Sequence, residues 1–160
     1  MADERIEVQR TIATDPATIF ALLSDPKGHV AIDSSGMLMS STGEPAKAVG
    51  DSFVVHMDRE ALNDYPDLGR YDVTVSITKY EQDREIAWTI LGALNLGHVY
   101  GYTLEPVEGG TLVTSYYDWS AIDPKYRDAG IFPVISELAL RATLGILARN
   151  VAPGPVTASG

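Results

Sequence analysis

The sequence predicts one α+β domain in which helices cover one face of an antiparallel sheet. Apolar and polar side chains alternate in several segments, a helical start signal follows the first of these, and an apolar stripe with helical spacing lies near the end. Strands that follow one another in a run, with helices before and after them, are typical of α+β folds. The chain has 160 residues, of which 45% are hydrophobic, and this is enough for one domain with a buried core.

Alternation with a period of two identifies the strands. The clearest segment is 70–80, in which Tyr71, Val73 and Val75 share one face while polar residues occupy the other. The Glu-Gly-Gly sequence at 108–110 predicts a hairpin turn between the last two strands, because glycine adopts the positive φ values of tight turns. Strands are expected over residues 5–14, 37–41, 52–58, 70–80, 85–91, 98–107 and 111–120.

Capping residues and apolar spacing identify the helices. Asp15 and Pro16 predict a helix start, since aspartate accepts hydrogen bonds from free amide groups and proline suits the first helical position. The closing helix carries a continuous apolar stripe, and Pro133 is expected in its first turn, where a missing N–H costs little. Helices are expected over 17–24, 29–33 and 131–150, with a loop over 59–69 and a mobile tail over 151–160 after a domain that covers 1–150.

The composition argues against several classes of function. The formal net charge is −10, with 12 Lys and Arg against 22 Asp and Glu. Nucleic acids and anionic membranes bind clustered basic residues, so neither partner is expected. The sequence has no cysteine and no metal-ligand spacing, and we expect no metal and no cofactor. The N-terminus lacks the apolar core of a signal peptide and no apolar run reaches about 20 residues, so we expect a cytoplasmic protein without membrane insertion.

Four stretches of the chain carry a resemblance to a known superfamily. They are IEVQRTIATDPATIFALLSDP, VTVSITKYEQDREIAW, GYTLEPVEGGTLVTSYYDWS and DPKGHVAIDSSG. Together with the closing helix, they resemble the START-like proteins, also called the SRPBCC or helix-grip superfamily. They are most similar to its polyketide cyclase/dehydrase-like branch, of the type common in actinobacteria. The similarity of pattern covers nearly all of residues 4–150.

The resemblance implies a seven-stranded curved antiparallel sheet wrapped on a long C-terminal helix, with two small helices between the first two strands. It also implies a cavity between sheet and helix that binds lipids, polyketides or other hydrophobic molecules. The motifs are specific for the fold and poor for function, because this fold hosts cyclases, transfer proteins, receptors and regulators. The chain departs from many members in its second small helix, where the segment 29–33 stands in place of one that carries a tryptophan.

Side chains on the inward parity of the strands are expected to line this cavity. Tyrosine and tryptophan are frequent among them, and each carries a polar group that needs a partner when buried. The alternative is that these aromatic side chains fill a solid core. The predicted ligand-binding residues are Tyr71, Val73, Val75, Trp88, His98, Tyr100, Tyr102, Tyr117 and Trp119 on the strands, with Ile135 and Leu138 on the closing helix.

The three histidines differ in their predicted environments. His29 and Asp33 share a face of the short helical segment, either as an acid–base pair at the pocket mouth or, as we favour, as a local structural contact. His56 falls on the outward parity of its strand and is expected at the surface. His98 shares the inward parity of Tyr100, and if buried it would stay neutral near pH 7 with one donor and one acceptor nitrogen.

Three functions are compatible with these features. The first is binding or carrying of a small hydrophobic molecule, and we rank it first because the predicted lining holds few ionisable groups. The second is a cyclase, aromatase or dehydratase for a polyketide-like substrate, with His98, Tyr102 and Asp33 as candidate catalytic residues that donate and accept protons. The third is an interaction protein that forms a homodimer through a sheet edge or the long helix.

Overall fold

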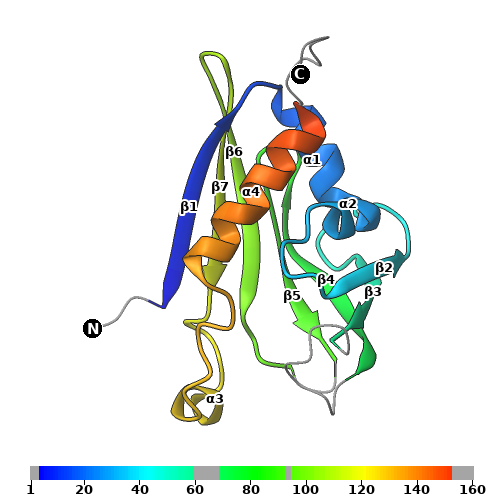
Figure 1. Cartoon of the computed structure of the whole chain (residues 1–160), viewed down its shortest axis with the longest axis vertical. Coiled ribbons are helices and arrows are strands. Elements are labelled where there is room, and N and C mark those ends of the chain that lie inside the picture. The colour runs from blue at the N-terminus through cyan, green and yellow to red at the C-terminus, as the bar shows by residue number, and fades with distance from the viewer. Residues whose placement is uncertain (1–3, 60–68, 93–94, 153–160) are drawn as a thin grey trace, which may run out of the picture.

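The computed structural model describes residues 4–59, 69–92 and 95–152 (Figure 1). Within these residues, seven strands form one antiparallel sheet in the order β1-β7-β6-β5-β4-β3-β2, and four helices accompany it. The predicted α+β class with a helix-grip arrangement is thereby confirmed. The strands are β1 (Arg5–Ile12), β2 (Leu38–Thr42), β3 (Ser52–Asp58), β4 (Arg70–Glu81), β5 (Glu85–Leu91), β6 (Val99–Val107) and β7 (Gly110–Asp118). The helices are α1 (Pro16–Ser24), α2 (Pro26–Ala31), α3 (Pro124–Asp128) and α4 (Glu137–Val151).

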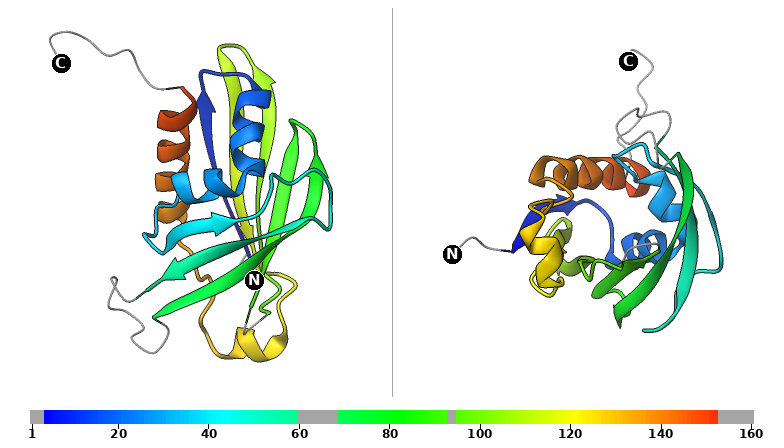
Figure 2. Two further views of the ribbon diagram at one scale, coloured as in Figure 1. Left: turned by 90° about the vertical axis from the view of Figure 1, so that its right-hand side faces the viewer. Right: turned by 90° about the horizontal axis from the view of Figure 1, so that it is seen from below.

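The sheet curls around the helices, and its concave face holds them (Figure 2). α4 packs on β1 and β7 and touches α1, while α1 lies against β5 and β6 and α2 lies against β2 and β3. β4 packs mainly on its two neighbouring strands, β3 and β5. The concave side of the sheet's middle strands is therefore the part that the helices cover least.

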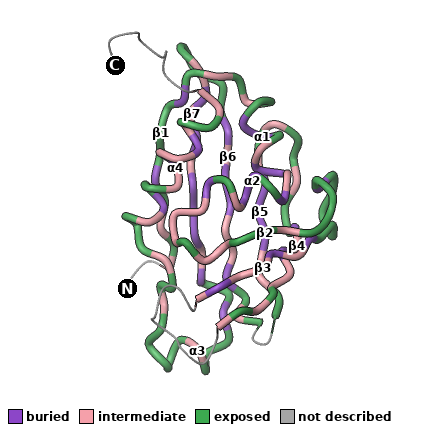
Figure 3. Tube along the Cα trace, turned by 45° about the vertical axis from the view of Figure 1, so that its right-hand side comes forward, coloured by how far each residue is buried: buried purple, intermediate pink, exposed green. Residues whose placement is uncertain are grey.

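Buried residues recur along the strands of the sheet (Figure 3). On β4 the inward parity is as predicted, with Val75 and Ile77 both 2% exposed. The register then shifts between Ile77 and Lys79, which is the mark of a β-bulge. The extra residue reverses the parity beyond it, so that the ring of Tyr80 turns inward and packs edge-on against Phe20 of α1, with 5.2 Å between ring centroids.

Asp–Pro pairs begin three of the four described helices. In each pair the aspartate carboxylate accepts a hydrogen bond from a first-turn amide, and the proline occupies the first helical turn. The second pair starts α2 directly after α1, so the predicted segment 29–33 is wrong by three residues at its start. α3 has no counterpart in the sequence prediction. The pairs are Asp15–Pro16, Asp25–Pro26 and Asp123–Pro124.

The closing helix starts six residues later than predicted. Ser136 caps it by accepting a hydrogen bond from the amide of Ala139 at 3.1 Å, so Pro133 precedes the helix instead of lying in its first turn. Its buried positions are Leu140, Leu144 and Leu147. The helix includes Val151, which the prediction assigns to the tail; residues 153–160 of that tail, and residues 60–68 of the predicted loop, lie outside the described residues.

The orientation of α4 lets us predict how substitutions on its two faces change the free energy of unfolding. Leu147 is fully buried, whereas Leu138 on the same helix is 76% exposed. We expect Leu147→Ala to lower the free energy of unfolding by about 2–5 kcal/mol, because it removes buried methyl groups and leaves a cavity. Leu138→Ala is the matched control and should change it by less than about 0.5 kcal/mol. Urea unfolding followed by circular dichroism measures both, and equal losses would contradict this orientation of the helix.

Candidate ligand pocket

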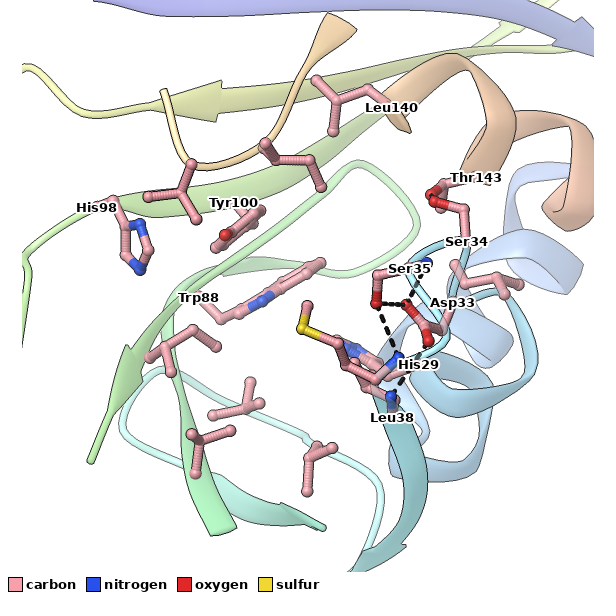
Figure 4. Close-up of a pocket in the computed structure, with 18 of the residues that line it drawn as sticks. His29, Asp33, Ser34, Ser35, Leu38, Trp88, His98, Tyr100, Leu140 and Thr143 are labelled. Carbon is pink, nitrogen blue, oxygen red and sulfur yellow. Dashed lines mark hydrogen bonds between the residues drawn. The ribbon is translucent and has the colours of Figure 1, made fainter. Parts of the chain in front are cut away.

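A pocket of about 310 Å³ lies between the concave face of the sheet, the helices and the segment that precedes α4 (Figure 4). Ligand pockets typically measure roughly 300–1,000 Å³, so this one suits a small molecule. Eight of the eleven predicted ligand-binding residues line it. Seven come from strand alternation, and the eighth, Ile135, lies just before α4 instead of on the helix: Tyr71, Val73, Val75, Trp88, His98, Tyr100, Tyr102 and Ile135.

Three predicted lining residues lie elsewhere. The rings of Tyr117 and Trp119 are buried in the core, with 5.5 Å between their centroids, and they back the pocket without lining it. Leu138 faces solvent, and Leu140 takes the predicted position at the pocket. Ile135 precedes α4, so the helical spacing that would place Leu138 on the same face as Ile135 does not apply. Within α4, residues advance by about 100° each, so Leu138 and Leu140 point in nearly opposite directions.

A row of aromatic rings forms one wall of the pocket. The ring of His29 stands 4.6 Å from that of Trp88, Trp88 stacks 6.1 Å from Tyr100, and Tyr100 meets His98 at 5.2 Å. In Figure 4, Trp88 accordingly lies between the two histidines. Aromatic side chains in such a row present a continuous apolar surface with polar groups at its two ends.

The His98 end of the row contains a buried hydrogen-bond network. His98 Nδ1 lies 2.7 Å from the hydroxyl oxygen of Tyr117. Burial lowers the pKa of His98 to about 4. Burial also raises the pKa of Tyr100 to about 12, partly offset by its hydrogen bond with Tyr117, and raises the pKa of Tyr117. All three side chains are therefore neutral near pH 7.

His29 lines the pocket and also makes a local structural contact, the role that the sequence favours for it. Its Nε2 lies 2.7 Å from the carbonyl oxygen of Leu23, and only 8% of the residue is exposed. Gly28 allows this approach of α2 to α1, because a Cβ there would stand 1.9 Å from the carbonyl oxygen of Leu22. Burial lowers the pKa of His29 to about 4, so it too is neutral at physiological pH. The sequence offers a position at the pocket only as the less favoured alternative for His29, since this position depends on how α2 packs on the sheet.

Asp33 organises the loop between α2 and β2. Its two carboxylate oxygens accept hydrogen bonds from the amides of Ser35, Gly36 and Leu38 and from the hydroxyl of Ser35. The hydroxyl of neighbouring Ser34 lies 2.8 Å from that of Thr143, which joins the loop to α4 (Figure 4). Asp33 and His29 thus have different partners, and the predicted pair between them does not form.

His56 lies on the outer face of the sheet, away from the pocket, as predicted from its parity. Its Nδ1 lies 2.8 Å from the carboxylate of Asp72 and its Nε2 lies 2.7 Å from the hydroxyl of Thr42, so the contact joins three neighbouring strands. Within the described residues, no group of three or more His, Asp and Glu side chains is placed to hold a metal ion. Nor does this part of the chain contain a helix with the length and hydropathy needed to cross a bilayer.

The histidine and tyrosine side chains of the pocket are neutral hydrogen-bonding groups, and Asp33 and Arg59 add a carboxyl and a guanidinium group to its lining. A side chain that transfers protons efficiently has a pKa near the working pH. Burial moves His29 and His98 below that range, and it moves Tyr100 and Tyr102 above it to about 12. These groups can donate and accept hydrogen bonds, and they hold their protonation states across neutral pH.

The family model described as "Polyketide cyclase / dehydrase and lipid transport" matches residues 3–152, and the chain belongs to this family. It is 26% identical over 157 residues to uncharacterized protein Rv0088 of Mycobacterium tuberculosis, covering 94% of this chain and 65% of that protein. The chain thus spans about two thirds of the length of this curated relative.

Solved structures with the same fold come from several bacteria. Protein CV1439 from Chromobacterium violaceum superposes with a TM-score of 0.67 at 16% identity, over 94% of this chain and 99% of that one. The Aha1 dimer from Colwellia psychrerythraea gives a TM-score of 0.60 at 17% identity, over 94% and 96% of the two chains. At these identities the likeness establishes the fold alone.

Because two histidines are buried, we can predict how the free energy of unfolding depends on pH. An imidazole in the unfolded chain takes up a proton near pH 6.5, whereas His29 and His98 in the folded protein do so only near pH 4. Protons therefore favour the unfolded state below pH 6.5. We expect the free energy of unfolding to fall between pH 6.5 and 4 by roughly 3 kcal/mol for each histidine, and these groups to have no effect above that range.

Urea unfolding at pH 7 and pH 4.5 measures this dependence. His98→Gln should remove about half of the decrease, and the matched variant His56→Gln on the outer face should keep all of it. If both variants lose stability with pH as steeply as the original protein, His98 is not buried in its neutral form.

Proposed function

We propose that this protein binds a small hydrophobic molecule in the pocket between the sheet and α4. The observation that carries the proposal is the pocket of about 310 Å³ with its apolar wall along β3, β4 and β5. Apolar pockets with a few placed polar groups are the usual form of small-molecule sites. The family description includes lipid transport, which agrees with a binding or carrier role.

The electrostatics of the pocket favour binding over turnover. A cyclase or dehydratase would need a donor and an acceptor that exchange protons near neutral pH. Of the candidate catalytic residues, His98 and Tyr102 have pKa values of about 4 and about 12, and the carboxylate of Asp33 is engaged by four loop hydrogen bonds. A catalytic role for them stays a prediction, as does a homodimer, for which sedimentation at several concentrations is the test.

Filling the pocket should abolish binding. Val73 lines the pocket, and the next residue on β4, Thr74, points to the opposite face of the sheet. We expect Val73→Phe to weaken binding of the neutral fluorescent probe N-phenyl-1-naphthylamine at least tenfold, because the added ring occupies the ligand's volume. Thr74→Phe adds the same ring outside the pocket and should bind the probe as the original protein does.

Fluorescence titration measures both variants, with circular dichroism to confirm that each is folded. Equal binding by the original protein and Val73→Phe would show that the probe binds elsewhere. No binding by any of the three proteins would contradict the proposed function itself.

A further inference from the structure

We propose that Nδ1 of His29 is a hydrogen-bond acceptor that selects ligands carrying a hydroxyl group. This inference rests on the proposed function and specifies the chemistry of its ligand. It begins from the contact of the other ring nitrogen, Nε2, with the carbonyl oxygen of Leu23 at 2.7 Å. A carbonyl oxygen only accepts hydrogen bonds, so Nε2 must carry the hydrogen. In a neutral imidazole the second nitrogen then has a lone pair and no hydrogen.

The ring of His29 is held in one orientation. It packs edge-on against Phe53 of β3 and Trp88 of β5, with centroid distances of 5.0 Å and 4.6 Å. A flip of the ring would break the bond to Leu23 and leave that carbonyl without its partner, which costs about 1–3 kcal/mol in a buried site. The acceptor nitrogen is therefore fixed in position before any ligand arrives.

Nδ1 of His29 has no hydrogen-bond partner among the described residues. Among the described residues, no side-chain nitrogen or oxygen is both unpaired and fully enclosed by protein. The unpaired Nδ1 of His29 is therefore accessible to a small molecule. Since His29 lines the pocket and 92% of it is buried, its free nitrogen is reached from the pocket. A buried acceptor without a partner favours a ligand that supplies a donor, because an apolar ligand would leave it unsatisfied.

His98, at the other end of the aromatic row, does not offer the same selectivity. Its Nδ1 faces a tyrosine hydroxyl, which can donate or accept, so its bond does not dictate which nitrogen carries the hydrogen. The remaining nitrogen of His98 can therefore suit either a donor or an acceptor. Of the two ends of the aromatic row, the His29 end alone requires a hydrogen-bond donor, such as a hydroxyl group, from the ligand. The ring of Trp88 lies next to this end.

Two probes of matched shape test this selectivity. 2-Naphthol carries a hydroxyl group, and 2-methoxynaphthalene differs only in the methyl group that replaces the hydroxyl hydrogen. We expect the original protein to bind 2-naphthol about tenfold more tightly in calorimetric titrations, which corresponds to one hydrogen bond. In His29→Phe this preference should fall to near unity, while His29→Gln, which keeps an amide donor and a carbonyl acceptor, should retain part of it.

A spectroscopic measurement on the unmutated protein keeps the test valid even if His29→Phe does not fold. Long-range ¹H–¹⁵N correlation spectra resolve both ring nitrogens of each histidine. Addition of 2-naphthol should shift the Nδ1 resonance of His29 in the direction of hydrogen bonding, and 2-methoxynaphthalene should leave it nearly unchanged. His56→Phe, on the outer face, serves as the control variant for the titrations.

The outcomes separate this inference from the proposed function. Equal affinity for the two probes would overturn the role of His29 and leave the proposed function intact. A preference for 2-naphthol that survives in His29→Phe and disappears in His98→Phe would also overturn the role of His29. The hydroxyl group would then be bound at the other end of the pocket. Failure of the original protein to bind either probe would contradict the proposed function and this inference with it.

Discussion

One helix cannot cover a seven-stranded curved sheet, and the pocket is the consequence of this mismatch. α4 reaches β1, β7 and α1, while the short helices α1 and α2 pack towards β5 and β6 and towards β2 and β3. The inward side chains of the middle strands are consequently left facing open space, and Val73, Val75 and Trp88 form the wall that a ligand would meet. Closely packed interiors leave few voids of this size, so a space of about 310 Å³ with an aromatic wall has the character of a binding site.

The histidine and tyrosine side chains around this space are neutral near pH 7. His29 is held by a backbone carbonyl, and His98 is held by a tyrosine hydroxyl. Each of these bonds satisfies a buried group within the protein, and burial itself lowers the pKa of both histidines. The result is an apolar site in which neutral hydrogen-bonding groups lie beside the carboxyl group of Asp33 and the guanidinium group of Arg59, which suits recognition of a hydrophobic molecule by one or two polar groups. Membership in a family described by both cyclase and lipid-transport functions is compatible with this physical picture.

Much of the fold could be predicted from the sequence, because alternation reports which face of each strand is buried. The inward positions on β4, β5 and β6 follow from this alternation. Beyond the bulge after Ile77, the alternation no longer predicts which side chains point inward. The helix starts that the sequence prediction missed also have a physical explanation. Asp25–Pro26 and Asp123–Pro124 carry the same capping chemistry as Asp15–Pro16, and Ser136 caps α4 where an apolar stripe alone suggests an earlier start. The role of His29 could not be predicted, since it depends on the packing of α2 against α1 and the sheet.

The space over the middle strands is proposed to be a ligand site and not a packing defect. A crystal structure of the protein grown with 2-naphthol tests this proposal. We expect a naphthol ring inside the pocket, against Trp88, with its oxygen within hydrogen-bond distance of His29. A structure in which the side chains around Trp88 close the space, with naphthol absent or bound only at the outer surface, would contradict it.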